Sequence, residues 1–277
     1  MASGFFTDTT ICIGCKACEV ACKQWNQLPG DGYAFTGNSY DNTVALGATS
    51  WRHVAFVEQM APPDEPVGTS RWLMMSDVCK HCTNAGCLEA CPTGAIVRNE
   101  FDNVFIQPDI CNGCGYCVPS CPFGVVDLIG HSDYPATRGF ESDGRTSDDA
   151  LQDRGGIAGK CTLCYDRQKD GLVPACAKAC PTDSIHFGDV DELKVQARER
   201  VATLRENGVD AYLYGVDEDT SVGDLNAFFL LTDAPGKYNL PERPVLPSTH
   251  QRAGYTSATI IAAALTLVGF VLFRTTK

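Results

Sequence analysis

Short apolar segments separated by polar turns predict a set of β-strands. Residues 95–98 and 104–106 are apolar runs on either side of the polar stretch 99–103, which is typical of a β-hairpin. Two later runs, 211–214 and 227–232, are rich in aromatic and aliphatic residues and also predict strands. All these elements are short, so we expect a body with many loops.

One amphipathic helix is predicted before the last two strands. Asp189 can cap its first turn, Glu192 follows three residues later, and Gly208 can end it. An apolar stripe repeats between them every three or four residues, at Leu193, Ala197, Val201 and Leu204.

The C-terminal segment differs from the rest of the chain. Residues 253–273 contain no charged side chain in 21 positions, between Arg252 and Arg274. At about 1.5 Å per residue this helix would be roughly 31 Å long, which predicts a transmembrane helix; a buried core helix is the alternative. Small residues on one face would pack against another membrane helix or face lipid: Gly254, Ala258, Ala262 and Thr266. Before the helix, prolines at 235, 241, 244 and 247 predict a stiff, extended linker.

The chain is acidic. In 277 residues, 34 Asp and Glu against 22 Lys and Arg give a formal net charge of −12. This charge argues against nucleic acid as a partner, because binding it requires clustered Lys and Arg. The segment 132–158 is polar, glycine-rich and acidic, and is expected to be a surface insertion. Sixteen cysteines in a chain of this length need an explanation other than a disulfide scaffold.

The cysteines form four groups, each opening with Cys-x2-Cys and closing with Cys-x3-Cys. The groups are Cys12, Cys15, Cys18 and Cys22; Cys79, Cys82, Cys87 and Cys91; Cys111, Cys114, Cys117 and Cys121; and Cys161, Cys164, Cys176 and Cys180. The first and third have the spacing of bacterial ferredoxins, whose thiolates bind 4Fe–4S clusters. Zinc is the alternative for soft thiolates, but zinc sites rarely use three cysteines at two-residue intervals with a distant fourth. The sequence therefore predicts four 4Fe–4S clusters.

Paired clusters of this type exchange one ligand, because the last cysteine of a run points to the neighbouring cluster. We expect this cysteine to open a helix, since proline follows it in three of the four groups. In an outer unit, the expected ligand sets are Cys12, Cys15, Cys18 and Cys180 for one cluster, and Cys161, Cys164, Cys176 and Cys22 for the other. In an inner unit, they are Cys79, Cys82, Cys87 and Cys121 for one cluster, and Cys111, Cys114, Cys117 and Cys91 for the other. Glycines would let backbone N–H groups approach the sulfurs, at Gly14, Gly86, Gly113 and Gly115.

No other motif indicates catalysis. The chain has neither a dinucleotide-binding glycine motif after a strand nor a His-Glu-x-x-His zinc motif. The stretch 155–160 resembles a phosphate-binding loop, but it is one residue short and Cys161 follows it, so we interpret it as an approach to the fourth cysteine group. His81 lies inside a cysteine loop that already has four ligands. Four one-electron centres without a catalytic centre predict an electron relay.

The expected fold class is α+β, with two ferredoxin-like bicluster units in a small, loop-rich body and one C-terminal transmembrane helix. The expected divisions are 1–30 with 155–188 (outer unit), 31–78 (strand-containing insertion), 79–131 (inner unit), 132–158 (polar surface insertion), 189–234 (helix plus strands), 235–252 (linker) and 253–273 (transmembrane helix). The outer unit would then combine two distant parts of the chain.

The cysteine groups and three stretches together carry a family resemblance. The stretches are 12–26, 36–43 and 51–56, the last expected to be a strand that packs aromatic side chains. With the single C-terminal span, they resemble the beta (iron–sulfur) subunit of membrane-bound formate dehydrogenase, among the four-cluster electron-transfer subunits of molybdopterin oxidoreductases. The resemblance covers roughly residues 5–250 and departs from the family in the insertion 132–158.

The resemblance implies a division of labour. A molybdopterin catalytic alpha subunit would oxidise formate, and electrons would enter at the cluster of Cys12, Cys15, Cys18 and Cys180. They would cross the outer unit and then the inner unit to a membrane cytochrome b-type gamma subunit and the quinone pool. The resemblance also implies a body on the outer face of the cell membrane with the C-terminus in the cytoplasm. Because residues 1–6 lack a basic, apolar signal sequence, export would depend on the twin-arginine signal of the catalytic subunit.

Two alternatives remain open at this point. The same relay could serve a nitrate, polysulfide or dimethyl sulfoxide reductase, although the anchor and the stretch 39–42 favour formate dehydrogenase. The chain could also be a membrane-tethered, ferredoxin-like adaptor. An adaptor would be soluble without its helix and would dock in a salt-sensitive manner through its acidic surface.

Replacing Cys22 tests the predicted ligand exchange. Because Cys22 is expected to complete the cluster of the fourth group, Cys22→Ser should remove or alter that group's signal in the electron paramagnetic resonance (EPR) spectrum of the reduced protein. Variants at Cys15 and Cys164 supply the reference spectra of the first and fourth groups. Loss of the first-group signal instead would refute the exchange.

Overall fold

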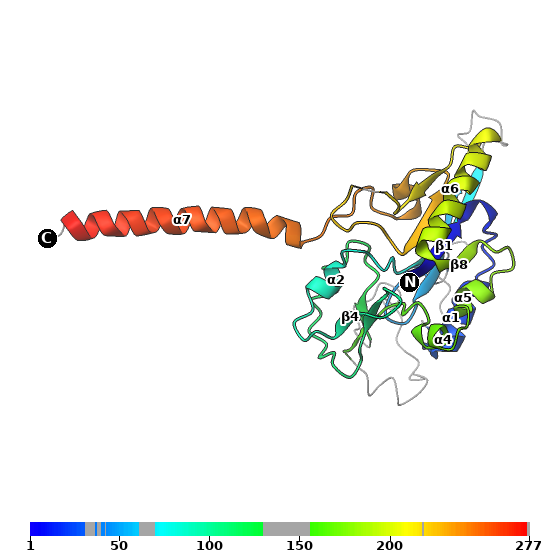
Figure 1. The fold of residues 1–277 in the computed structure, drawn as a ribbon, viewed down its shortest axis with the longest axis horizontal. Helices are drawn as coiled ribbons and strands as arrows, with labels where there is room; N and C mark the ends of the chain where they lie inside the picture. The colour runs from blue at the N-terminus through cyan, green and yellow to red at the C-terminus, as the bar shows by residue number, and fades with distance from the viewer. Residues whose placement is uncertain are drawn as a thin grey trace.

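The structure is a computed structural model that describes residues 1–30, 37, 40–41, 43–60, 70–129, 156–217 and 219–275. The predicted insertion 132–158 lies outside the described residues except for positions 156–158, and so do positions 36, 38, 39 and 42 of the stretch 36–43. Figure 1 shows a small body from which one long helix, α7, projects.

A four-stranded sheet with the order β8-β1-β10-β9 lies at the centre of the body. Its strands are β1 (Ser3–Asp8), β8 (Ile185–Asp189), β9 (Tyr212–Tyr214) and β10 (Ala227–Leu231). β1 is parallel to β10 and antiparallel to β8, and β9 is antiparallel to β10. All of β10 is buried, as an uninterrupted apolar strand requires. β9 and β10 confirm the two strands predicted after the helix.

Helix α6 (Val190–Glu206) packs against β1 and β8 (Figure 1). The carboxylate of Asp189 accepts hydrogen bonds from the N–H groups of Asp191 and Glu192 at 3.0 and 3.2 Å, which confirms the predicted cap. The buried positions of this helix are Val190, Leu193, Ala197 and Val201. They agree with the predicted apolar stripe, whose last member, Leu204, is only partly buried.

The described residues also form three antiparallel two-stranded ribbons. They are β2 (Arg52–Gln59) with β3 (Arg71–Val78), β4 (Ile96–Arg98) with β5 (Val104–Ile106), and β6 (Asp127–Leu128) with β7 (Ala158–Gly159). β4 and β5 confirm the predicted hairpin. β2 confirms a strand in the stretch 51–56 and extends it to Gln59.

Short helices accompany the cysteine groups. They are α1 (Ala17–Asn26), α2 (Gly86–Glu89), α4 (Tyr165–Lys169) and α5 (Ala175–Lys178), with a 3-10 turn, η1 (Thr9–Ile11), before the first group. The prediction that the fourth cysteine opens a helix is wrong: Cys22 lies inside α1, and Cys91 and Cys180 follow the ends of α2 and α5. The reason is that Cys-x3-Cys spans one helical turn, and the proline after it ends the helix. Where Lys23 replaces proline, α1 continues to Asn26.

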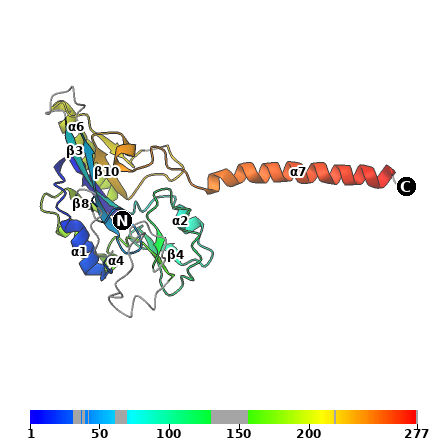
Figure 2. The same ribbon diagram turned by 180° about the vertical axis from the view of Figure 1, so that it is seen from behind.

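The segment before the anchor packs on the body, so the prediction of an extended linker is wrong. Pro235–Tyr238 form a 3-10 turn (η3), and Tyr238, Leu240 and Leu246 are buried. Helix α7 (Ser248–Thr275) begins before residue 253. Its part Gly254–Arg274 is the one helix in the described ranges that is long and apolar enough to cross a membrane. Figures 1 and 2 show it extending away from the body.

Two hydrophobic clusters hold the body together, and β1 separates them. Phe6 belongs to the cluster between the sheet and α6, whereas Phe5 belongs to the cluster around the cysteines. Consecutive strand residues point to opposite faces of a sheet. One face of β1 therefore packs against the cluster between the sheet and α6, and the other face packs against the cluster around the cysteines.

Gly4 tests how closely β1 is packed. A Cβ at this position would lie 2.0 Å from the carbonyl oxygen of Asn226 and 2.8 Å from Cγ2 of Val190. Gly4→Ala should lower the free energy of unfolding by about 1–3 kcal/mol, because the backbone must shift to make room. The measurement is the midpoint of thermal denaturation by circular dichroism. Gly236→Ala, whose Cβ would meet no atom within 4 Å, is the control; equal midpoints for both variants would contradict the packing.

Candidate iron–sulfur centres

The structure brings the sixteen cysteines together as four sets of four. We name these sets site 1 (Cys12, Cys15, Cys18, Cys180), site 2 (Cys161, Cys164, Cys176, Cys22), site 3 (Cys79, Cys82, Cys87, Cys121) and site 4 (Cys111, Cys114, Cys117, Cys91). Each of sites 1 and 4 lines one small cavity. In site 2 the other three cysteines surround Cys22, and in site 3 they surround Cys82. These are the sets that the expected ligand exchange requires.

Neighbouring helices arrange this exchange in the outer unit. α1 carries Cys18 of site 1 and Cys22 of site 2, while α5 carries Cys176 of site 2 and is followed by Cys180 of site 1. Cysteines one turn apart lie on the same face of a helix. Because α1 and α5 pack against each other, each can serve both sites.

The four sites form one line. Sulfurs of neighbouring sites interact electrostatically in the pairs Cys18 with Cys176, Cys161 with Cys79, and Cys87 with Cys117. The order is therefore site 1, site 2, site 3, site 4. Cys15 at one end and Cys114 at the other are exposed, whereas the remaining cysteines are buried or half-buried. The fully exposed cysteines therefore lie at the two ends of the line, and site 2 is the site whose four cysteines are all buried.

Burial disfavours a bare thiolate at these sites. It raises the pKa of the Cys18 and Cys87 thiols to about 12, and that of Cys164 to about 11. A directly bound cation is needed to hold such sulfurs deprotonated. In the described part of the chain, no three His, Cys, Asp or Glu side chains lie close enough to hold a single metal ion. A cubane cluster offers each sulfur an iron of its own, so the residues present fit 4Fe–4S clusters.

Hydrogen-bond donors reach several of the sulfurs. They include the hydroxyl of Ser76, 3.1 Å from Cys18 Sγ, the N–H of Leu163, 3.2 Å from Cys161 Sγ, and the N–H of Ala158, 3.4 Å from Cys111 Sγ. At Cys91 slight burial raises the thiol pKa, but the Thr93 hydroxyl and nearby backbone N–H groups outweigh it and lower that pKa. Such donors favour negatively charged sulfur.

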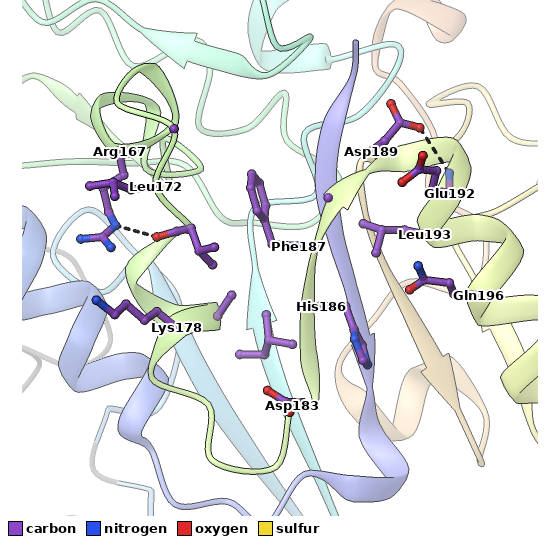
Figure 3. Close-up of a pocket in the computed structure, with 15 residues that line it drawn as sticks. Arg167, Leu172, Lys178, Asp183, His186, Phe187, Asp189, Glu192, Leu193 and Gln196 are labelled. Atoms are coloured by element: carbon purple, nitrogen blue, oxygen red, sulfur yellow. Dashed lines mark hydrogen bonds between the residues drawn. The ribbon is translucent and has the colours of Figure 1, made fainter.

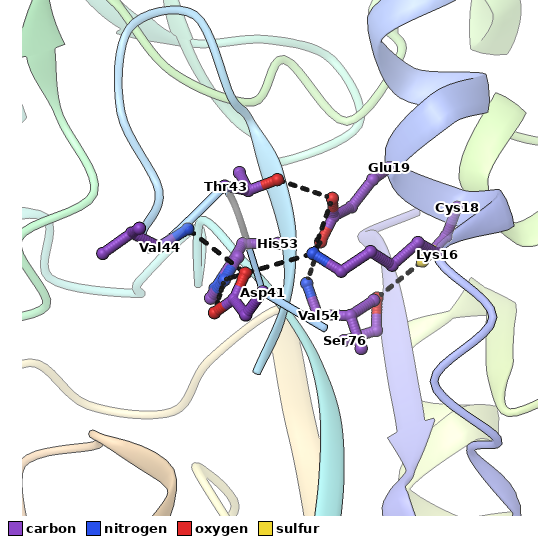
Figure 4. Close-up of polar contacts among 9 residues, drawn as sticks. All are labelled: Lys16, Cys18, Glu19, Asp41, Thr43, Val44, His53, Val54 and Ser76. Carbon is purple, nitrogen blue, oxygen red and sulfur yellow. Dashed lines mark hydrogen bonds and ion pairs between the residues drawn. The ribbon is translucent and has the colours of Figure 1, made fainter. Parts of the chain in front are cut away.

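A network of charges ties the loop of site 1 to β2 (Figure 4). The ammonium of Lys16 lies 3.1 Å from Asp41 and 3.2 Å from Glu19. His53 lies 2.8 Å from Asp41, and Glu19 also accepts a hydrogen bond from the N–H of Val54. Burial alone would raise the pKa of Asp41, but His53 and Lys16 lower it to about 2. Lys16 is therefore paired with at least one carboxylate, that of Asp41, that is charged at neutral pH.

Gly14 in the same loop is required by its surroundings. Its φ is +66°, and a Cβ there would lie 2.6 Å from the ring of Phe56 and 2.7 Å from the sulfur of Met74. Gly86 is just as confined, because a Cβ would lie 2.3 Å from the carbonyl oxygen of Ser120. These two glycines thus bring whole segments together, in addition to the predicted role toward the sulfurs.

Two buried cations lie among the sulfurs, and sequence analysis did not assign them to the sites. Arg52 is beside sites 1 and 2, and Lys160 is beside sites 2 and 3. Two features of the sequence could have indicated this role: the position of Arg52 in a largely apolar strand, and that of Lys160 directly before Cys161. His81 is also fully buried, and burial followed by the nearby cations lowers its pKa well below the usual range.

An open groove of about 680 Å³ lies beside β8, one of the two edge strands of the sheet (Figure 3). Arg167, Leu172 and Lys178 line one wall, and Phe187 projects into it from β8. None of the described cysteines lines the groove. It is therefore separate from the four sites.

Comparison with known proteins also indicates 4Fe–4S clusters. Residues 70–132 with 149–190, and residues 11–95, match two families that are both described as a 4Fe-4S dicluster domain. The chain is 38% identical over 241 residues to the formate dehydrogenase iron-sulfur subunit of Haemophilus influenzae, covering 86% of this chain and 68% of the relative. It is 38% identical over 249 residues to the formate dehydrogenase-O iron-sulfur subunit of Escherichia coli, covering 87% and 72%. It is 31% identical over 226 residues to the iron-sulfur subunit of a putative dimethyl sulfoxide reductase of Halobacterium salinarum, covering 79% and 80%.

Glu19 tests the support of site 1. Glu19→Ala removes an acceptor from Lys16 and from the N–H of Val54, and should cost about 1–3 kcal/mol of stability. The loosened loop should lose iron from site 1 faster than from site 4 during incubation with a chelator, as followed by EPR. Glu199→Ala removes an exposed carboxylate of α6 and is the control. Equal rates of loss in both variants would show that the network does not support the site.

Proposed function

The chain belongs to the iron–sulfur subunits of formate dehydrogenases, and we propose that it relays electrons from formate oxidation at a molybdopterin catalytic subunit to a cytochrome b-type membrane subunit and the quinone pool. Each site, when it holds its 4Fe–4S cluster, supplies a one-electron centre. The observation that carries the proposal is the single series of four neighbouring cysteine sites, with an exposed cysteine at each end.

We propose that the four cysteines of each site are the ligands of one cluster. The outer unit then comprises site 1 and site 2, and the inner unit comprises site 3 and site 4. The convergence of each set and the unfavourable burial of its bare thiolates support this assignment. Helix α1, which carries Cys18 and Cys22 one turn apart, would supply a ligand to each of sites 1 and 2.

The base of α7 supports an orientation with the inner unit next to the membrane. The hydroxyl of Ser248 donates a hydrogen bond of 2.8 Å to Glu89 of α2, and the side chain of Leu246 lies 3.2 Å from the Cβ position of Gly86. α2 carries Cys87 of site 3 and precedes Cys91 of site 4. In Figures 1 and 2, α2 lies on the side of the body toward α7, and α1 lies on the far side. Electrons would enter at site 1 and leave at site 4.

Exposed apolar side chains at both ends support contact with partner subunits. Ile13 is 57% exposed next to site 1, and Tyr116 is 63% exposed next to site 4. Apolar surface beside an exposed cysteine is what a partner subunit covers. The catalytic subunit would then cover site 1, and the cytochrome b-type subunit would cover site 4.

The membrane anchor supports a single-pass arrangement in the cell membrane. α7 has one apolar span, Gly254–Arg274, so the body and the C-terminus would lie on opposite sides. We place the body on the outer face and the C-terminus in the cytoplasm, with export of the body together with the catalytic subunit.

A second candidate is the same relay in a dimethyl sulfoxide reductase. The Halobacterium salinarum relative is covered over 80% of its length at 31% identity, and a component of the anaerobic dimethyl sulfoxide reductase of Escherichia coli is 30% identical over 198 residues. In a reductase the electrons would run in the opposite direction, from site 4 to site 1.

Substrate-dependent reduction separates the two candidates. Formate added anaerobically to native membranes that contain the tagged chain should produce the EPR signals of reduced clusters, because the catalytic subunit would deliver electrons at site 1. A Cys15→Ser variant should weaken this response, while dithionite still reduces sites 3 and 4. If formate has no effect and dimethyl sulfoxide instead oxidises the dithionite-reduced clusters, the second candidate replaces the first.

A further inference from the structure

Arg52 and Lys160 are buried at two successive junctions in the line of sites. Arg52 is 2% exposed, and the sulfurs that act on it belong to Cys18 of site 1 and to Cys176, Cys161 and Cys22 of site 2. Lys160 is 3% exposed, and the sulfurs that act on it belong to Cys161 of site 2 and to Cys79, Cys87 and Cys121 of site 3. Site 2 is thus the site that both cations border.

Neither cation forms an ion pair with a carboxylate within the described ranges. Arg52 donates through Nη1 to the carbonyl and hydroxyl of Ser76 at 3.2 and 3.1 Å, and its Nε and Nη2 have no hydrogen-bond partner among the described residues. Lys160 donates to the carbonyls of Val104 and Cys161. Carbonyl oxygens solvate a buried cation but do not cancel its charge. The sulfur ligands and their clusters are the negative charges left to balance the two cations.

A third buried cation, Arg167, is 6% exposed and acts on Cys164 of site 2. It donates to the carbonyl of Val173 and forms no ion pair with a carboxylate among the described residues.

Other cations near the sites are paired with carboxylates. Lys16 beside site 1 is paired with Asp41 and Glu19. Lys80 beside site 3 is paired with Asp77. In site 4, the charges that act on Cys117 are sulfurs of its own site. Among the described residues, site 2 therefore borders three uncompensated buried cations, Arg52, Lys160 and Arg167, whereas sites 1 and 3 border one each.

We propose that Arg52 and Lys160 give the cluster at site 2 the highest reduction potential of the four. Reduction adds a negative charge, and a nearby buried cation stabilises that charge strongly where the dielectric constant is low. Burial of site 2 acts in the opposite direction, since exclusion of water disfavours added charge. The two cations decide the order because both act on this one site.

With the highest potential at site 2, a single electron in the relay would reside mainly at that site. Site 2 is enclosed, whereas the terminal sites 1 and 4 include the exposed Cys15 and Cys114. An electron held at site 2 is separated from solvent oxidants at both ends. Arg52 and Lys160 are thus positioning residues that act through the cluster potential. The proposal rests on the proposed ligand sets of the four sites.

A mediated redox titration of the complex in native membranes, followed by EPR, tests the proposal. The signal of site 2 is identified as the one that Cys22→Ser removes or alters. In the wild type, this signal should appear first as the potential is lowered. Lys160→Met should lower the potentials of sites 2 and 3, and Arg52→Met should lower those of sites 1 and 2. A tenfold change in the ratio of reduced to oxidised cluster corresponds to about 59 mV for one electron.

The conservative variants separate charge from packing. Lys160→Arg and Arg52→Lys retain the cation and should leave the potentials near the wild-type values, with site 4 unchanged in all variants. Equal shifts at all four sites, or none, in methionine variants that retain their clusters would overturn the proposal. If a methionine variant fails to assemble, the titration of the wild-type complex still tests the proposal. A reduction potential higher than that of site 2 at any other site would refute the proposal. The titration uses dithionite and mediators, so its outcome does not depend on formate as the substrate.

Discussion

The convergence of cysteines from distant parts of the chain on each site is the constraint on which the rest of the structure depends. A Cys-x3-Cys spacing spans about one helical turn, so α1 carries Cys18 of site 1 and Cys22 of site 2. In the outer unit this brings Cys22 to the fourth cysteine group and Cys180 to the first. β1 also pairs with β8, although more than 170 residues separate them in the chain, so the cysteine groups next to these strands in the chain lie close together.

Charge is the second constraint. The formal charge of the chain is −12, and sixteen thiolates around four cores of about +2 each would add roughly −8. Buried donors and cations offset this field locally, and they come from elements without a cysteine as well as from the cysteine loops. Arg52 begins β2 and is held over the ring of Phe5 at 4.7 Å, so the ribbon β2–β3 contributes to the electrostatics of the sites. The strand that sequence analysis interpreted as aromatic packing thus also has an electrostatic role.

The packing at the base of α7 links the line of sites to the candidate membrane span. The chain between the last strand and α7 is folded onto the body through Tyr238, Leu240 and Leu246. A packed connection limits the angles between the body and the anchor, whereas an extended linker would leave them free. The described side chains of the apolar span are exposed, which is the state expected of a surface that lipid or another membrane helix covers.

The sequence by itself determined the cofactor chemistry, the anchor and most local elements. Cysteine spacing is a local signal, and the hairpin 95–106, the cap at Asp189 and the apolar span depend only on neighbouring residues. The ends of the helices were predicted less well, because the proline after Cys91 and Cys180 fits either the start or the end of a helix. Tertiary structure alone decided that β1 lies between the two hydrophobic clusters, that Arg52 and Lys160 lie among the sulfurs, and that α2 lies beside the base of α7. Each of these depends on contacts between residues far apart in the chain, and no local pattern in one sequence records such contacts.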